Sequence, residues 1–414
     1  MAAAAPPNNQ PLDVSRRWTV TTLAGSARGF ADLPGTTARF DAPIGIAVSR
    51  TGLVYVADRA NRRIRQIHPE TGAVETLVHL AHSPEGLAVS PTTGRVYVTD
   101  GDDHCILEIN QETRAVRPLA VAAGLRFPRG LAVSRTGLVY VADIDTHCIH
   151  TVDPTTGEVR VLAGSPGFAG AEDGPVGSVA RFYSPTGVAV ARSGDIYVAD
   201  ALNFRIRKIH RTGEVTTVPG SHMNLPCGIA VSSRGDVYVA DTENNRIRQI
   251  DPETGAVTTL AGSGEPGFLD ANCSTSRFQG PSGVAVGGPD GDGVVYVADT
   301  ENHRIRAITP SANPGLVAMA RKAIVNSNSK LGALPGNVVG DIFSYVGNTR
   351  GRGGGVHPRI ADPAEAARHK KAMNEMEAEA LRSVEAGGAV AAANKRSRRT
   401  TRHRKANRKT RRSR

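Results

Sequence analysis

The amino-acid sequence predicts an all-β fold: a six-bladed β-propeller closed by an N-terminal strand and followed by short helical segments and a disordered basic tail. Three observations predict the propeller. One phrase recurs six times, each copy contains four short strand patterns, and the strand that the last copy lacks is found near the start of the chain. A single four-stranded unit cannot bury both of its faces, so six units are expected to stack around an axis.

The repeated phrase begins with P-x-G-[ILV]-A-V and ends, a few residues later, with [VI]-Y-V-[AT]-D. The spacings between the final aspartates are 42, 43, 57, 41 and 58 residues, so two intervals contain an extra segment just before the proline. A third such segment, residues 26–42, precedes the first copy. The six aspartates are Asp58, Asp100, Asp143, Asp200, Asp241 and Asp299.

Each copy is expected to form four strands, from the GIAV, VYVAD, RIRQI and GAVTTLAG patterns, with Gly, Asn, Asp and Pro between them. The sixth copy continues into SANPGLV after its third strand and has no fourth. Residues 18–25, WTVTTLAG, match the fourth-strand phrase at 258–262. The N-terminal strand is therefore expected to complete the last blade, which removes two open sheet edges.

The phrase VYVADTENNRIRQI, preceded by P-x-G-[IV]-A-V, resembles the NHL repeat. The resemblance covers about residues 18–309, whereas WD-repeat propellers are a poor match because the chain has one tryptophan. The resemblance implies a six-bladed propeller and leaves the function open, because such propellers include binding scaffolds and metal-dependent lyases.

Composition divides the chain into six parts. These are a disordered N-terminus at 1–17, the propeller at 18–312, a short helical segment at 313–346, a Gly/Arg-rich linker at 347–361, a helix at 362–388 and a basic disordered tail at 389–414. Residues 334–346 are expected to form a helix that packs against the propeller. The alternative interpretation is the opening of an F-box, the module that recruits ubiquitin ligases, which this segment resembles.

The positive charge of the chain lies in its tail. Residues 395–414 hold twelve Lys or Arg and no acid, so the formal charge of +11 leaves −1 for the other residues. The tail lacks aromatic side chains, which favours phosphate binding without sequence preference, or nuclear targeting. The basic residues that we expect to do this include Lys395, Arg396, Arg398, Arg399, Arg402, Arg404, Lys405, Arg408, Lys409, Arg411 and Arg412.

No apolar run approaches the length of a transmembrane helix, and the N-terminus lacks the pattern of a secretory signal. We therefore expect no membrane partner and an intracellular location, which includes the nucleus. The four cysteines form no CxxC pair and are expected to be free thiols.

Four copies contain Asp-x-x-Asn-x-Arg after the tyrosine strand. Asp and Asn favour the turn between the second and third strands, and the arginine two residues after Asn is expected to return to the Asp. Copies two and three have Cys105 and Cys148 in place of that arginine. His104, His147 and His303 share one turn position, but they belong to separate blades, so we predict turn residues and no zinc site. We expect no catalytic residue, metal ligand set or cofactor.

The function predicted is that of a non-enzymatic interaction scaffold that binds a protein or peptide partner, with nucleic acid possible through the tail. The alternative is a metal-dependent lyase or hydrolase with its site at the central channel. Each long insertion has Gly-Phe early and Arg-Phe late, and we expect the phenylalanines to clamp it onto its blade. The insertions and the Asp-x-x-Asn turns are expected on one face, around the channel mouth. The predicted contact residues are Phe30, Asp32, Phe268, Asp270, Asp241 and Asp299.

Overall fold

The computed structural model describes residues 18–120, 124–175, 179–287 and 293–310. The expected N-terminal segment, the helices, the linker and the basic tail lie outside these residues. Among the residues that are described, no helix has the length and apolar character that crossing a membrane requires. The four cysteines are free thiols, as predicted, and all but Cys227 are buried.

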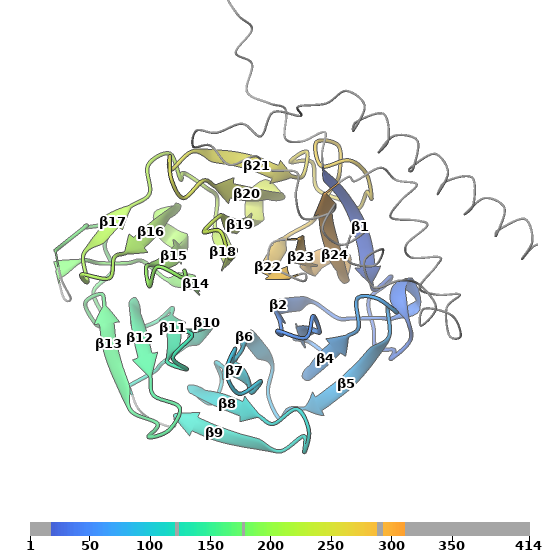
Figure 1. Cartoon of the computed structure of the whole chain (residues 1–414), viewed down its shortest axis with the longest axis horizontal. Coiled ribbons are helices and arrows are strands. Elements are labelled where there is room, and N and C mark those ends of the chain that lie inside the picture. The colour runs from blue at the N-terminus through green and yellow to red at the C-terminus, as the bar shows by residue number, and fades with distance from the viewer. Residues whose placement is uncertain (1–17, 121–123, 176–178, 288–292, 311–414) are drawn as a thin grey trace, which may run out of the picture. The chain divides into compact units, whose positions relative to one another are not determined.

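Six four-stranded antiparallel sheets surround a central axis, which confirms the predicted propeller (Figure 1). Blade 1 consists of β2 (Pro43–Val48), β3 (Val54–Asp58), β4 (Arg63–Ile67) and β5 (Val74–His79). Blade 2 consists of β6 (Pro84–Val89), β7 (Val96–Asp100), β8 (Cys105–Ile109) and β9 (Val116–Ala120). Blade 3 consists of β10 (Pro128–Val133), β11 (Val139–Asp143), β12 (Cys148–Val152) and β13 (Val159–Ala163).

Blade 4 consists of β14 (Pro185–Val190), β15 (Ile196–Asp200), β16 (Arg205–Ile209) and β17 (Val215–Thr217). Blade 5 consists of β18 (Pro226–Val231), β19 (Val237–Asp241), β20 (Arg246–Ile250) and β21 (Val257–Ala261). Blade 6 consists of β22 (Pro281–Gly287), β23 (Val294–Asp299), β24 (Arg304–Pro310) and β1 (Trp18–Ala24). Within the described ranges, single-turn 3₁₀ helices lie between strands at η2 (Gly35–Thr37), η4 (Ala201–Asn203), η5 (Thr242–Asn244) and η6 (Thr300–Asn302).

The glycine of each P-x-G phrase allows the inner strands to crowd around the axis. A Cβ atom at Gly45 would overlap the Glu85 carbonyl oxygen of the next blade, and the same holds at the five equivalent glycines. The second strands are buried along their length because both of their faces pack against sheet neighbours in adjacent blades. The core is therefore a series of apolar layers between blades.

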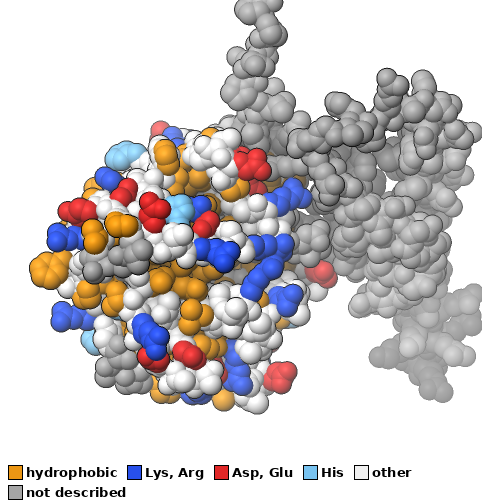
Figure 2. Space-filling view, turned by 60° about the vertical axis from the view of Figure 1, so that its left-hand side comes forward, with side chains coloured by type: hydrophobic (Ala, Val, Ile, Leu, Met, Phe, Trp, Pro, Cys, Tyr) orange, Lys and Arg blue, Asp and Glu red, His pale blue; other side chains and the backbone are white. Residues whose placement is uncertain are grey.

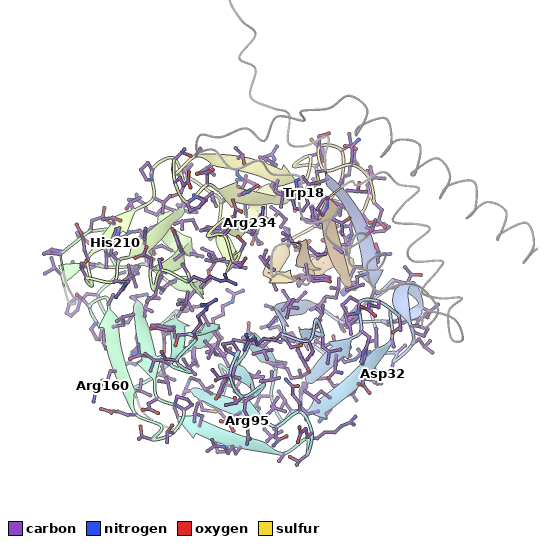
Figure 3. The ribbon with its side chains drawn as sticks, viewed as in Figure 1. Trp18, Asp32, Arg95, Arg160, His210 and Arg234 are labelled. Carbon is purple, nitrogen blue, oxygen red and sulfur yellow. The ribbon has the colours of Figure 1, made fainter. Side chains whose placement is uncertain are left out.

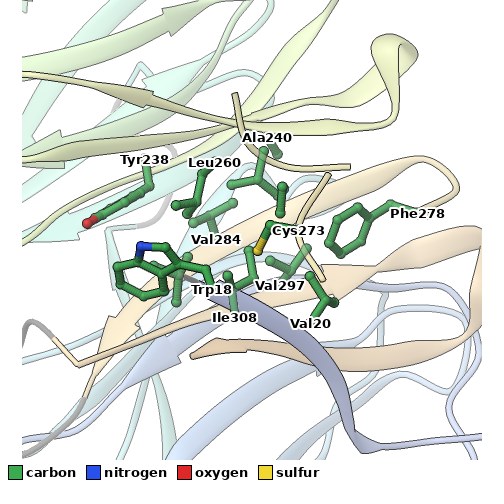
Figure 4. Close-up of a cluster of buried hydrophobic side chains, with 13 residues drawn as sticks. Trp18, Val20, Tyr238, Ala240, Leu260, Cys273, Phe278, Val284, Val297 and Ile308 are labelled. Carbon is green, nitrogen blue, oxygen red and sulfur yellow. The ribbon is translucent and has the colours of Figure 1, made fainter. Parts of the chain in front are cut away.

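The N-terminal strand closes the ring, as predicted. β1 pairs antiparallel with β24 from Trp18 opposite Pro310 to Ala24 opposite Ile305. Trp18 and Val20 on this strand join Tyr238 and Leu260 of blade 5 in one buried cluster (Figure 4). The first strand in the sequence thus supplies the outer strand of the last blade and part of the core between blades 5 and 6.

Candidate functional site

The Asp-x-x-Asn turns are locked by hydrogen bonds within and beyond the turn, which confirms their predicted structural role. Asp58 Oδ1 accepts the backbone N–H of Asp41 at 2.8 Å, and Oδ2 accepts Asn61 Nδ2 at 2.9 Å. The arginine predicted to return to this aspartate does not do so, because Arg63 Nη1 donates to the Asn61 carbonyl instead. Arg65 binds Asp58 instead. It lies two residues after Arg63 on β4, so its side chain projects from the same face of the strand but is buried within the blade.

Arg65 is fully buried beneath the first long insertion and uses all five of its N–H groups. Nη1 donates to Asp58 Oδ2 at 2.7 Å and to the Arg39 carbonyl at 3.1 Å. Nη2 donates to Asp32 Oδ1 at 2.5 Å and to the Ala31 carbonyl at 2.8 Å, and Nε donates to Asp32 Oδ1 at 2.9 Å. A single side chain therefore ties the insertion to the blade.

The same arrangement recurs in the other two blades that follow an insertion. We name the insertions by the blade that they precede: insertion 1 (26–42), insertion 4 (164–182) and insertion 6 (263–280). The buried arginines of blades 4 and 6 each bond the turn aspartate, the insertion aspartate and two insertion carbonyls: Arg207 with Asp200, Asp173, Arg181 and Glu172, and Arg306 with Asp299, Asp270, Arg277 and Leu269.

Phenylalanines pack against the buried arginines, so the expected phenylalanine clamp is built around a cation. Arg65 lies 4.9 Å from the Phe30 ring and 4.8 Å from the Phe40 ring. Phe40 is buried, whereas Phe30 is 45% exposed. Insertion 6 repeats this geometry around Arg306. Cation–π contacts of this kind fasten each loop and leave one aromatic ring at the surface.

A threonine on the outer strand completes each anchor. Thr76 on β5 donates its hydroxyl to Asp32 Oδ2 at 2.8 Å, and Thr217 on β17 binds Asp173 through both its backbone N–H and its hydroxyl. Thr22 on β1 donates its backbone N–H to Asp270 Oδ2 at 3.0 Å. We refer to the turn aspartate, the turn asparagine, the buried arginine and this threonine as the anchor site of a blade.

The insertions were expected around the channel mouth, and this prediction is wrong, because they reach over the outer strands instead. Gly174 pairs with Val215 of β17, and Asn272 pairs with Thr19 of β1. Asp32 lies above the outer part of blade 1 (Figure 3). The insertions do share a face with the Asp-x-x-Asn turns, because Asn61 Nδ2 donates to the Gly29 carbonyl of insertion 1 at 2.8 Å. Insertion 1 extends toward the outer strand because its Asp32 binds both the buried Arg65 and Thr76 on β5.

The structure divides the predicted contact residues into three groups. Phe30 and Phe268 are each 45% exposed and stack on Arg63 and Arg304 at 4.1 and 4.0 Å. The side chains of Asp32 and Asp270 are about one-third exposed and are ion-paired to the buried arginines, and Asp241 and Asp299 are fully buried.

Large apolar side chains gather on the face with the insertions. In the described ranges, all exposed ones except Val116 and Val161 belong to the insertions or to the turns beside them: Phe30, Leu33, Phe168, Val179, Tyr183, Leu202, Phe204, Phe268 and Leu269. Figure 2 shows one side of the propeller, where apolar side chains alternate with acidic and basic ones. Exposed apolar groups of this kind, rimmed by charges, are typical of interaction surfaces.

The central channel is lined by the second residue of each P-x-G phrase and its neighbours. Glu85 is the one carboxylate in the described lining, which contains no histidine. Glu85 accepts a hydrogen bond from Arg59 Nε at 2.7 Å. Catalytic zinc sites use three protein ligands, so this lining does not supply the set that a metal-dependent lyase needs.

The three turn histidines do not converge. His147 Nδ1 accepts the backbone N–H of Ser184, and His303 Nδ1 accepts that of Ala42, so each supports the start of the following blade. His82, Asp100 and Asp103 of blade 2 do lie together, with candidate ligand atoms within 4.8 Å of one another. His82 Nδ1 lies 3.3 Å from Asp100, and the hydrogen bond with Asp100 raises the pKa of this histidine. The contacts of His82 with Asp100 and Asp103 account for this cluster, which sequence reasoning missed because His82 precedes the repeated phrase.

His150 of blade 3 makes the propeller sensitive to acid. Burial lowers the pKa of the imidazole, although Asp143 acts in the opposite direction. The unfolded chain therefore takes up a proton first, near pH 6.5, and stability is lost as the pH falls from there toward the folded pKa. Each tenfold loss of proton affinity corresponds to about 1.4 kcal/mol. We expect His150→Leu, which copies Leu107 of blade 2, to flatten the decrease in melting temperature between pH 7 and pH 5. An unchanged pH profile would contradict this assignment.

Comparison with known proteins supports the fold. The sequence model of the NHL repeat family matches six segments, residues 40–67, 82–108, 125–151, 182–209, 223–250 and 278–308, one in each blade. A protein of unknown function from Bacteroides thetaiotaomicron aligns with a TM-score of 0.60 and 21% identity, over 70% of this chain and 76% of that protein. A gluconolactonase from Xanthomonas campestris aligns with a TM-score of 0.54 and 14% identity, over 75% and 96%. At such identities the similarity shows the fold alone.

A curated relative corrects the expected location. The chloroplastic protein SUPPRESSOR OF QUENCHING 1 of Arabidopsis thaliana is 29% identical over 139 residues, which cover 34% of this chain and 9% of the relative. The match therefore spans less than a tenth of the relative. The expectation of a nuclear or general intracellular location is contradicted, because the relative is a chloroplast protein, which points to an organelle.

Proposed function

Because the chain is an NHL-repeat β-propeller, we propose that it acts as a non-catalytic scaffold that holds a protein or peptide partner against the face with the insertions. The observation that carries this proposal is the gathering of exposed apolar side chains on that face. The relative in chloroplasts favours an organellar setting.

The anchored insertions support this proposal. Binding costs less when the contact surface is already ordered, and the buried arginines hold insertions 1 and 6 against their blades. These two insertions belong to neighbouring blades, and β1 links them: its Val20 N–H donates to the Ala271 carbonyl, and residue 25 leads directly into insertion 1. Phe30 and Phe268, each stacked on an arginine, are the proposed contacts for a partner of mixed charge. The buried Asp241 and Asp299 support the turns beneath them.

We expect the double substitution Phe30→Ser and Phe268→Ser to reduce partner capture at least fivefold without lowering the melting temperature by more than a few degrees. Proximity labelling of the tagged chain measures capture, and Val116→Ser with Val161→Ser is the matched control because these exposed side chains lie on the outer strands β9 and β13 and outside the insertions. Shortening the loops is a poorer test, since it would remove the insertion aspartates and carbonyls that Arg65 and Arg306 bind and so destabilise the blades. Equal labelling by the two double variants would refute the proposed face.

The basic tail contributes a separate proposal. Residues 395–414 lie outside the described residues, and we propose that their twelve cations bind phosphate groups, including those of nucleic acids, without sequence preference. In the labelling experiment, a chain that ends at residue 394 distinguishes partners held by the tail from partners held by the propeller.

A further inference from the structure

Blade 5 has a complete anchor site but no insertion to occupy it. The connection into this blade, residues 218–225, is short. The anchor positions are nevertheless filled by Asp241, Asn244, Arg248 and Thr259. Blades 2 and 3 also lack insertions, and there the site is lost, with Leu107 and His150 in place of the arginine and Pro118 and Val161 in place of the threonine.

Two buried polar atoms in this anchor site have no partner. Asp241 is fully buried and its Oδ2 accepts no hydrogen bond, whereas Asp58 Oδ2 in blade 1 accepts one from Arg65. Arg248 Nε is also buried without a partner, whereas Arg65 Nε donates to the aspartate of insertion 1. Arg248 Nη1 donates to the Thr259 hydroxyl at 3.0 Å instead. A buried polar group without a partner is costly. Arg248 Nε therefore lacks the carboxylate that an insertion provides elsewhere, and Asp241 Oδ2 lacks the arginine contact that accompanies it in blade 1.

A hollow of about 450 Å³ lies beside the anchor site. Its lining includes Asn224 and Asn244, and Asn224 donates its backbone N–H to Asp241 Oδ1. Asn244 corresponds to Asn61, whose side chain donates to the Gly29 carbonyl of insertion 1. The hollow therefore lies where the first glycine of an insertion is held in blade 1.

The outer edge of blade 5 is also uncovered. Thr258 and Thr259 of β21 are exposed, and β21 is the last strand of its sheet. In blades 4 and 6 the insertion forms hydrogen bonds with the outer strand. Val215 of β17 donates its N–H to the Gly174 carbonyl of insertion 4, and Cys273 of insertion 6 donates its N–H to the Trp18 carbonyl of β1. Open strand edges accept extended peptides by adding a strand.

We propose that blade 5 binds an acidic, extended peptide of a partner protein in place of an insertion. The sequence expected for this peptide is that of insertions 1 and 6, which both contain Gly-Phe-x-Asp, at residues 29–32 and 267–270. The peptide aspartate accepts Arg248 Nε, and its aromatic ring stacks on Arg246, as Phe268 does on Arg304. The site lies on another blade from the proposed Phe30 and Phe268 contacts, so either proposal stands without the other.

The test uses a fluorescent peptide with the sequence of residues 265–272, EPGFLDAN, titrated into the full chain and followed by anisotropy. We expect saturable binding, weakened at least tenfold when the peptide aspartate is replaced by asparagine. We expect Arg248→Met to weaken binding by a similar factor. The matched control is Arg160→Ala, which removes an exposed arginine from the outer strand of blade 3 and should leave binding unchanged.

Equal binding of the aspartate and asparagine peptides would overturn the proposal, and so would binding that Arg248→Met does not weaken. Self-association that depends on Arg248, without peptide binding, would also overturn it by assigning the anchor site to a second copy of the chain. The two peptides are compared on the unmodified protein, so misfolding of a variant cannot imitate the expected result.

Discussion

Removal of residues 1–25 is expected to lower the melting temperature of the propeller by on the order of 10 °C. The deletion removes β1, so β24 becomes an open edge and Trp18 and Val20 leave the buried cluster between blades 5 and 6. Insertion 6 also loses its bonds to this strand. Each large buried side chain contributes roughly 1.5–3 kcal/mol, and the three strands that remain in blade 6 lose their outer neighbour.

Thermal unfolding followed by circular dichroism measures this effect. The control is a chain that starts at residue 18, which keeps the whole of β1. If the chain without residues 1–25 melts within a few degrees of that control, the closing strand does not hold the ring together.

Arg65→Met is expected to destabilise the propeller by about 3–5 kcal/mol. The substitution leaves Asp58 buried without its cation and frees Asp32 and two insertion carbonyls, although methionine approximates the volume of the arginine stem. Replacement of one partner of a buried ion pair lowers the free energy of unfolding by far more than the pair contributes, because the remaining charge is buried without water or a counter-ion. Chemical denaturation measures the change in the free energy of unfolding.

Arg63→Met is the matched control, since Arg63 is two residues away on the same strand, stacks on the same Phe30 ring and donates its hydrogen bond to the Asn61 carbonyl instead of to an insertion residue. We expect it to cost less than about 1 kcal/mol. Adding Asp58→Asn to Arg65→Met should restore part of the lost stability, because the uncompensated charge is then removed. Equal effects of Arg63→Met and Arg65→Met would show that Arg65 does not anchor insertion 1.

The difference between Arg63 and Arg65 shows where sequence reasoning was limited. Both arginines follow the turn, and the shorter distance along the chain favoured Arg63 as the partner of Asp58. A strand places both side chains on one face, so spacing alone does not distinguish them. One signal was present: among the copies preceded by an insertion, each has an arginine seven residues after the turn aspartate and an aspartate within the insertion. Arg248 repeats the first half of that signal without the second, and this is the feature that distinguishes blade 5.

The sequence by itself determined the six blades, the four strands in each and the closing N-terminal strand. These follow from a local pattern, because strand periodicity and turn residues act over a few positions and each copy repeats them. Only the tertiary structure decided that the insertions extend over the outer strands, that Asp241 and Asp299 are buried, and which arginine each loop covers. These outcomes depend on groups about 30 residues apart, such as Asp32 and Arg65, whose pairing is determined by depth of burial and not by spacing along the chain.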